Sequence, residues 1–229
     1  MRRLALPLLS LLCLPSLALA QGLGTPSAMP MVVDLKKVEI GTFAEYAMSA
    51  AGVTLSSRWA LVGKDAKSCT VETVTKATIL PQPVAIRIQL PLDPTSASSK
   101  SLGKVIMQMG DADPMYAPAE MPEPKFQKPD PKTLVGPEEI KVPAGSFKTL
   151  HYRETNASAT VDVWVSDEVP PLGMVKVVNT PKVNPKDPQT MQVGPSTMEL
   201  SALGKGQKAV ITKKPKPFDP KKMGAPGAK

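Results

Sequence analysis

The chain has 229 residues, of which 42% are hydrophobic and 4% are aromatic, and it contains one histidine and two cysteines. So few histidines and cysteines exclude the usual zinc ligand sets, and the sequence has neither a phosphate-binding P-loop nor a Gly-x-Ser-x-Gly nucleophile motif. The formal net charge of +8 is concentrated near the end of the chain, where residues 205–229 contain eight lysines and one acid.

Residues 1–20 have the three parts of an export signal. Residues 1–3 supply positive charge, residues 4–19 are apolar apart from two serines, and Ala18-Leu19-Ala20 matches the small-x-small pattern that precedes cleavage. The apolar run is interrupted by prolines and is shorter than the about 20 residues of a membrane span. We therefore expect a signal helix that is cleaved after Ala20, and a mature protein that is exported, periplasmic or extracellular, and not transmembrane.

Cleavage leaves 209 of the 229 residues and a single cysteine, Cys69, because Cys13 departs with the signal. One cysteine cannot form an internal disulfide, so a hydrophobic core must hold the fold together. Cys69 begins a strand-like run, residues 69–74, and we expect it to be a small buried apolar side chain. An intermolecular disulfide or a reactive thiol is the alternative.

Residues 34–49 contain the one helix candidate after the signal. Leu35, Val38, Phe43 and Tyr46 recur at partly helical spacing, but Gly41 and its neighbour interrupt the pattern. The pattern therefore predicts at most one short helix followed by a strand.

Alternation with period two is the main signal in the rest of the chain. Apolar and polar side chains alternate clearly in 53–61, 84–90 and 161–165, which is typical of half-buried antiparallel strands. Shorter segments with the same pattern are 43–50, 67–76, 104–109, 146–155, 174–179 and 197–203. The sequence therefore predicts a mostly β fold of about nine strands in one domain, residues 21–204.

Residues 111–137 contain seven prolines in 27 residues, which is incompatible with a central strand. Loops of this length are uncommon in compact domains and often serve as lids or binding loops. This segment is therefore either a surface excursion or a cover over an opening in the sheet.

The end of the chain, residues 205–229, is rich in lysine and proline and has little apolar surface, which predicts a disordered tail. Residues 21–204 have a net charge of about −1, so the basic character belongs to this tail. The tail either only aids solubility or tethers the protein to an anionic envelope surface, such as lipid head groups, a cell-wall polymer or an acidic partner. Nucleic acid is not expected as a partner, because the chain does not interleave basic residues with aromatic residues that could stack on bases. The candidate tether residues are Lys213, Lys214, Lys216, Lys221 and Lys222.

Residues 138–179 predict a meander: a short strand at 139–142, the turn Pro143-Ala144-Gly145, and then three strands joined by loops. The sequences VPAGSF at 142–147, VDVWVS at 161–166 and PPLG at 170–173 resemble those of exported bacterial proteins of the lipoprotein-carrier (LolA-like) superfamily and their uncharacterised relatives. The resemblance covers about 40 residues well. It implies a curved antiparallel sheet, or half-open barrel, around an apolar groove that holds acyl chains in the best-known members.

Two features qualify what the resemblance implies. The chain has only nine aromatic residues, and much of its strand surface is Thr, Ser and Ala, which argues against a large lipid pocket. The motif residues are structural rather than chemical: Gly145 permits a positive φ in the turn, and Phe147 and Trp164 are expected to pack on the sheet.

Catalysis would have to use His151, the only histidine, which is expected to be half-exposed on a strand face beside Arg153. A nearby cation disfavours the imidazolium that a general base must become, so the sequence predicts no enzyme. No metal or cofactor is predicted either. The spacing of four acids in the proline-rich loop matches no calcium motif. Four methionines in or just before this loop are expected to be core residues and not copper ligands. These acids are Asp111, Asp113, Glu120 and Glu123, and the methionines are Met107, Met109, Met115 and Met121.

The leading functional hypothesis is an exported, non-enzymatic binding protein of the bacterial cell envelope that holds an apolar or lipid-like ligand in a sheet groove. The alternative is a structural or interaction protein with a filled core and a basic tether. Candidate groove residues are Trp59, Ile86, Ile88, Met107 and Trp164.

Overall fold

The computed structural model describes residues 29–50, 52–92, 102–118, 121, 125–182 and 194–219. The signal helix predicted for residues 1–20 lies outside them.

Most of the described chain forms one antiparallel sheet of eleven strands, in the spatial order β7-β6-β5-β4-β3-β2-β13-β12-β11-β10-β9. The strands of the first half are β2 (Phe43–Ala50), β3 (Val53–Lys64), β4 (Ser68–Ala77), β5 (Val84–Pro91), β6 (Ile106–Met109) and β7 (Met115–Tyr116). Those of the second half are β9 (Leu134–Val142), β10 (Gly145–Thr155), β11 (Ala159–Val165), β12 (Met174–Pro181) and β13 (Ser196–Gly204). The mostly β fold class is therefore confirmed, and the predicted strands reappear with small shifts at their ends.

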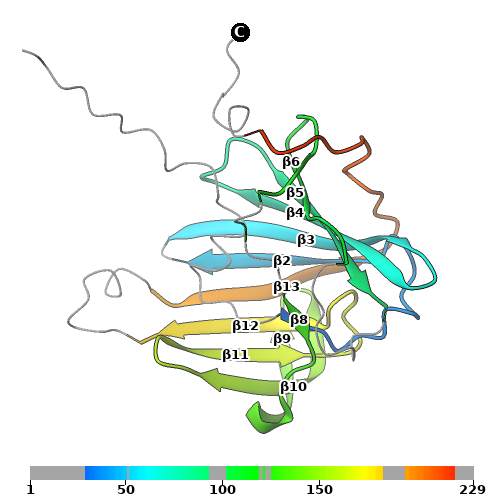
Figure 1. Cartoon of the computed structure of the whole chain (residues 1–229). Coiled ribbons are helices and arrows are strands. Elements are labelled where there is room, and N and C mark those ends of the chain that lie inside the picture. Colours follow the sequence, from blue (N-terminus) through cyan, green and yellow to red (C-terminus); the bar gives the residue numbers. More distant parts are fainter. Residues whose placement is uncertain are drawn as a thin grey trace, which may run out of the picture.

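Two meanders make up this sheet, and the last strand joins them. Strands β2 to β7 pair in sequence, as do β9 to β12, and β13 lies between β12 and β2. The outermost strands β7 and β9 do not pair with each other, so the sheet curves without closing into a barrel (Figure 1). This open, curved antiparallel sheet confirms the predicted architecture.

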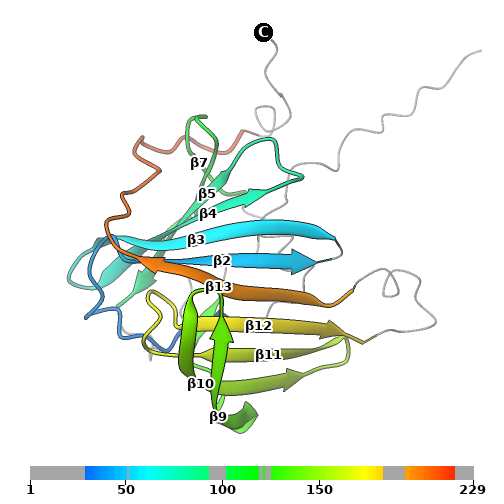
Figure 2. The same cartoon turned by 180° about the vertical axis from the view of Figure 1, so that it is seen from behind.

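The two faces of the sheet have different covers. We call the face that carries Tyr46, Trp59 and Ile86 the inner face, and the opposite one the outer face. Figure 1 shows short strand β8 (Phe126–Gln127) in front of the sheet, whereas Figure 2 shows the β9–β10 hairpin on the opposite side. The β9–β10 turn donates a hydrogen bond from the Ala144 N–H to the Leu200 carbonyl of β13, 3.2 Å away.

The cover of the inner face belongs to the chain itself. Strand β1 (Met29–Pro30) pairs with β8 in parallel, so the start of the described chain and the proline-rich loop meet there. Met31, Leu35 and Phe126 are at most 1% exposed and belong to the same hydrophobic cluster as the inner-face side chains. Burial of this much apolar surface is the main stabilising contribution to the fold.

The short helix allowed for residues 34–49 is absent from the structure. Lys37 N–H donates to the Asp34 carbonyl in a single turn, and the chain then enters β2 through Gly41, whose φ is +92°. That backbone conformation strongly disfavours a side chain and ends any helical run. A side chain at Gly41 would also crowd the backbone of Gly206.

The proline-rich segment is more ordered than a surface excursion. Besides β7 and β8 it contains a 3-10 turn, Pro131–Thr133, and the beginning of β9. Pro137 lies inside β9, which is the outermost strand of the sheet, where a missing N–H donor costs least. The segment therefore supplies both a sheet edge and part of the inner-face cover.

Candidate functional site

Four of the five predicted groove residues lie together on the inner face. Trp59 of β3 lies opposite Thr73 of β4, which in turn lies opposite Ile86 of β5, and Ile86 lies opposite Met107 of β6. Residues directly opposite each other in an antiparallel sheet point to the same face, so these side chains share the inner face. Ile88 points to the same face two residues along β5. All four side chains are between 2% and 9% exposed, so they are core residues beneath the cover.

Trp164, the fifth candidate, lies on the outer face. Its neighbour Val163 lies opposite Val177 of β12, which lies opposite Met198 of β13, and these three side chains point to the inner face. Successive side chains of a strand point to opposite faces, so Trp164 points outward. Its ring stacks on His151 with centroids 4.3 Å apart, and its Nε1–H donates to Glu138 Oε2 at 2.7 Å. The structure therefore does not place Trp164 with the other four candidates.

The inner face also carries buried polar groups that the sequence reasoning missed. The Tyr46 hydroxyl donates to the Met174 carbonyl at 3.1 Å, and burial raises the pKa of that phenol. Asn179 is 3% exposed, and its Oδ1 has no hydrogen-bond partner. A buried acceptor without a donor is costly, which marks Asn179 as the one chemically unusual position among the described inner-face residues.

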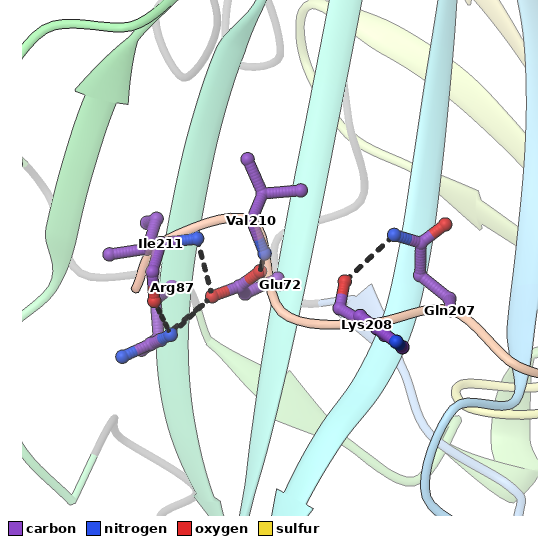
Figure 3. A network of polar contacts seen from close by, with 6 residues as sticks. All are labelled: Glu72, Arg87, Gln207, Lys208, Val210 and Ile211. Carbon is purple, nitrogen blue, oxygen red and sulfur yellow. Dashed lines mark hydrogen bonds and ion pairs between the residues drawn. The ribbon is translucent and has the colours of Figure 1, made fainter. Parts of the chain in front are cut away.

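The predicted disordered tail needs correction for residues 205–219, which we call the strap. The strap leaves β13 and crosses the outer face over β3, β4 and β5 (Figure 3). Ile211 is 1% exposed, so the strap is anchored by an inward-pointing side chain. The prediction was wrong here because the strap gains its contacts from distant strands rather than from its own composition. Residues 220–229 lie outside the described part of the chain.

The central attachment of the strap is an ion pair that binds its backbone (Figure 3). The Glu72 carboxylate, 2% exposed, accepts the Val210 N–H at 2.6 Å and the Ile211 N–H at 3.3 Å. Arg87 donates to the same carboxylate at 2.9 and 2.6 Å and also donates to the Ile211 carbonyl. We call Glu72 and Arg87 the clamp, because between them they satisfy both amides and one carbonyl of an extended segment.

Two further attachments hold the ends of the strap. Near its start, Gln207 N–H donates to the Gly41 carbonyl, and the Gln207 side chain accepts from Arg58. Near its end, the Lys216 backbone bonds to β7 through the Tyr116 N–H and to the Pro114 carbonyl. The strap therefore also covers the open edge of β7, which reduces the risk of pairing with another chain.

Asp113 receives two of the predicted tether lysines. Lys216 Nζ lies 2.6 Å and Lys213 Nζ 3.0 Å from its carboxylate oxygens. The hydrogen bonds from Lys216 and then Lys213 lower the pKa of Asp113 to about 2. Lys214 is exposed, and Lys221 and Lys222 lie outside the described residues.

His151 is buried rather than half-exposed as predicted, with 7% of its surface accessible, because the curled β9–β10 hairpin covers this part of the outer face. Its Nε2 lies 2.7 Å from Asp162 Oδ1, and its Nδ1 lies 3.5 Å from Glu138 Oε2. Arg153 also donates to Asp162. These contacts and the stacked Trp164 occupy the imidazole on both edges and one face.

The remaining candidates are packing or surface residues. Cys69 is a free, buried thiol, as expected, and burial raises its pKa to about 11. Met109 and Met121 pack against the core. Glu120 and Glu123 lie outside the described residues. Within the ranges that the structure describes, no three His, Cys, Asp or Glu side chains gather as a metal-binding group. In those same ranges no helix has the length and hydropathy needed to cross a bilayer.

Comparison with known proteins gives little to place beside this geometry. No protein-family model and no curated protein matches the chain. Among solved structures, the chain is similar to a Bacteroides fragilis protein with a YmcC-like fold whose export is inferred. The identity is 12%, the match covers 78% of this chain and 100% of that one, and the TM-score is 0.36.

Proposed function

We propose that this chain is an exported, non-enzymatic interaction protein of the bacterial cell envelope, with a filled core and a basic C-terminal region that contacts an anionic surface. Export rests on the signal at residues 1–20, and the envelope setting on the resemblance to the lipoprotein-carrier superfamily.

The observation that favours this function is the occupied inner face. Four of the five residues expected to line a groove are buried with Met31, Leu35 and Phe126 of the same chain. An acyl chain would have to displace these residues, whose burial contributes about 2 kcal/mol for each large side chain. The free surface for binding is therefore the outer face and the strap.

Absence of catalysis is part of the proposal. His151 is the one candidate base, and its ring nitrogens face Asp162 and Glu138 while its ring stacks on Trp164. A general base needs a free lone pair within reach of a substrate proton, which this arrangement does not offer.

The test is sedimentation of the purified mature protein with isolated bacterial envelopes at low and high salt. We expect binding that is lost at about 0.5 M salt, where charges are screened within a few ångströms. No sedimentation with envelopes at any salt concentration would rule the function out.

A second candidate, holding of an apolar ligand, is favoured by one observation. Asn179 Oδ1 is a buried acceptor on the inner face that a ligand hydroxyl or amine could satisfy. This second function predicts that a fatty alcohol raises the melting temperature of the wild type and not of Asn179→Leu, whereas a filled inner face predicts no shift for either protein. An equal shift for both proteins, or none for the wild type, would exclude Asn179 as a ligand contact.

A further inference from the structure

The strap is an ordered part of the outer face, so its charges have fixed neighbours. The clamp holds the strap over β4 and β5, and Asp113 holds its far end. Ile211 is 1% exposed, whereas its neighbour Val210 is 39% exposed. Strap lysines therefore extend from a folded surface instead of from a free tail.

Cations outnumber acids on this surface. We call it the cationic surface, and it consists of Arg58, Lys76, Arg87, Lys104, Lys208, Lys213, Lys214 and Lys216. Three acids pair with four of these cations, namely Glu45, Glu72 and Asp113, and even with Asp111 and Asp219 counted the acids number five against eight cations. Each of the first three acids is already paired with members of the surface.

The unpaired part of this charge is exposed to solvent. Lys208 and Lys214 are exposed on the strap, and the side chains of Lys213 and Lys216 keep 65% and 61% of their surface accessible despite their ion pairs. Exposed ion pairs contribute little to stability, so these lysines exchange Asp113 for another anion at small cost.

We propose that the cationic surface is the docking face for an anionic lipid bilayer, so that the protein lies on the membrane with its outer face toward the head groups. This inference rests on the proposed function and adds the partner and the orientation. A bilayer fits better than a soluble polyanion because the surface also exposes apolar Val210 among the lysines, which suits the boundary between head groups and acyl chains.

Because the strap is folded onto the sheet, the proposal predicts one orientation of the protein on the membrane, which a free tail would not. A disordered lysine tail binds an anionic surface whatever the orientation of the folded body, with each lysine contributing about equally. A clamped strap adds its charge to Arg58, Lys76 and Lys104 of the body. Charge reversal on the strap should therefore matter more than the same reversal elsewhere on the molecule.

The experiment compares two double variants of the full mature chain in vesicle sedimentation. Lys208→Glu/Lys214→Glu reverses two exposed lysines of the cationic surface. Lys36→Glu/Lys37→Glu makes the same change in net charge on the exposed turn that precedes β2. The vesicles are phosphatidylcholine alone, or phosphatidylcholine mixed with an equal part of phosphatidylglycerol.

We expect the wild type to bind only the vesicles that contain phosphatidylglycerol. The strap variant should bind them more than tenfold more weakly, because each lysine near an anionic membrane contributes a severalfold factor to the affinity. The turn variant should bind with an affinity within about threefold of that of the wild type. Equal loss in both variants would overturn the docking face, because only net charge would then matter.

Other outcomes are equally decisive. Binding to dextran sulfate without binding to the vesicles would assign the surface to a soluble polyanion and overturn the lipid proposal. Sedimentation with bacterial envelopes but not with phosphatidylglycerol vesicles would overturn this inference and leave the proposed function standing.

Discussion

Glu72 is the residue on which the attachment of the strap depends. It lies in the middle of β4 with 2% of its surface exposed, and its two oxygens accept two strap amides and two guanidinium N–H groups. A buried carboxylate is tolerated only when it is paired and hydrogen-bonded in this way. The same groups satisfy the backbone polar atoms of a segment that has no strand partner there.

We predict that Glu72→Gln lowers the free energy of unfolding by about 3 kcal/mol, because it leaves the partly buried Arg87 without its counter-charge. Glu45→Gln is the matched control. Its partner Arg58 is 41% exposed, so the loss should not exceed about 1 kcal/mol. Urea denaturation of both variants measures the difference, and equal losses would show that the clamp is no more than a surface ion pair.

Cys69 gives a second prediction at this scale. Burial raises the pKa of its thiol to about 11, so the nucleophilic thiolate is scarce at neutral pH, and the side chain is 1% exposed. We expect Ellman's reagent to label the native protein at pH 8 at least a hundredfold more slowly than the protein in urea. Labelling at the rate of a free thiol would mean that the strand carrying Cys69 opens readily.

Among the elements, the far end of the strap has the clearest pH dependence. The bonds from Lys216 and Lys213 lower the pKa of Asp113 from 3.8 to about 2. A carboxyl whose pKa is lowered by its partners contributes stability above its ordinary pKa and loses it as pH falls through the lowered value. The attachment is therefore complete at neutral pH and weakens between about pH 4 and pH 2.

We predict that the amide resonances of Tyr116 and Lys216 keep their attached-state shifts down to about pH 4 and move below it. In Asp113→Asn the same resonances should be displaced already at neutral pH. Shifts that do not depend on pH while the amides of β3 keep their native positions would show that the backbone bonds alone hold this end.

The loop between β11 and β12 supplies a test of how the inner-face cover is seated. Gly173 has a φ of +90°, and a Cβ there would overlap the Val32 side chain and lie 3.0 Å from the Ser166 carbonyl oxygen. Gly52 has a similar φ of +81°, but a Cβ there meets nothing within 4 Å. The two glycines therefore separate backbone strain from steric overlap with the cover.

We predict that Gly52→Ala costs about 1 kcal/mol of unfolding free energy from backbone strain alone, and that Gly173→Ala costs about 2–4 kcal/mol because overpacking adds to that strain. Thermal or urea denaturation measures both. Equal costs would mean that the segment containing Val32 moves aside freely, which would weaken the account of a filled inner face.

For the whole molecule, the strand content followed from the sequence because side-chain alternation is local. Residues 84–90 alternate clearly and residues 43–50 alternate in part, and they became β5 and β2 with almost no change of boundaries. The motif at 142–147 likewise became the turn between β9 and β10, with Gly145 at a φ of +136°. Local patterns of this kind determine strands and turns but say little about which strands meet.

The candidate site was poorly predicted because its contacts are non-local. Glu72 and Val210 are 138 residues apart, and no periodicity links a strand carboxylate to a tail amide. The burial of His151 likewise depends on a hairpin that curls over its own sheet. Opposite charges on neighbouring strands, Glu72 and Arg87, were the one available hint, and it becomes usable only once their register is known.

The inner face is filled by the chain itself, and Trp59 reports on this directly. In Trp164→Phe, Trp59 is the remaining tryptophan, and it lies 9% exposed among the residues first expected to line a groove. Titration of this variant with brominated stearic acid should leave its fluorescence unchanged at micromolar concentrations. Saturable quenching would place an acyl chain beside Trp59 and contradict the filled core.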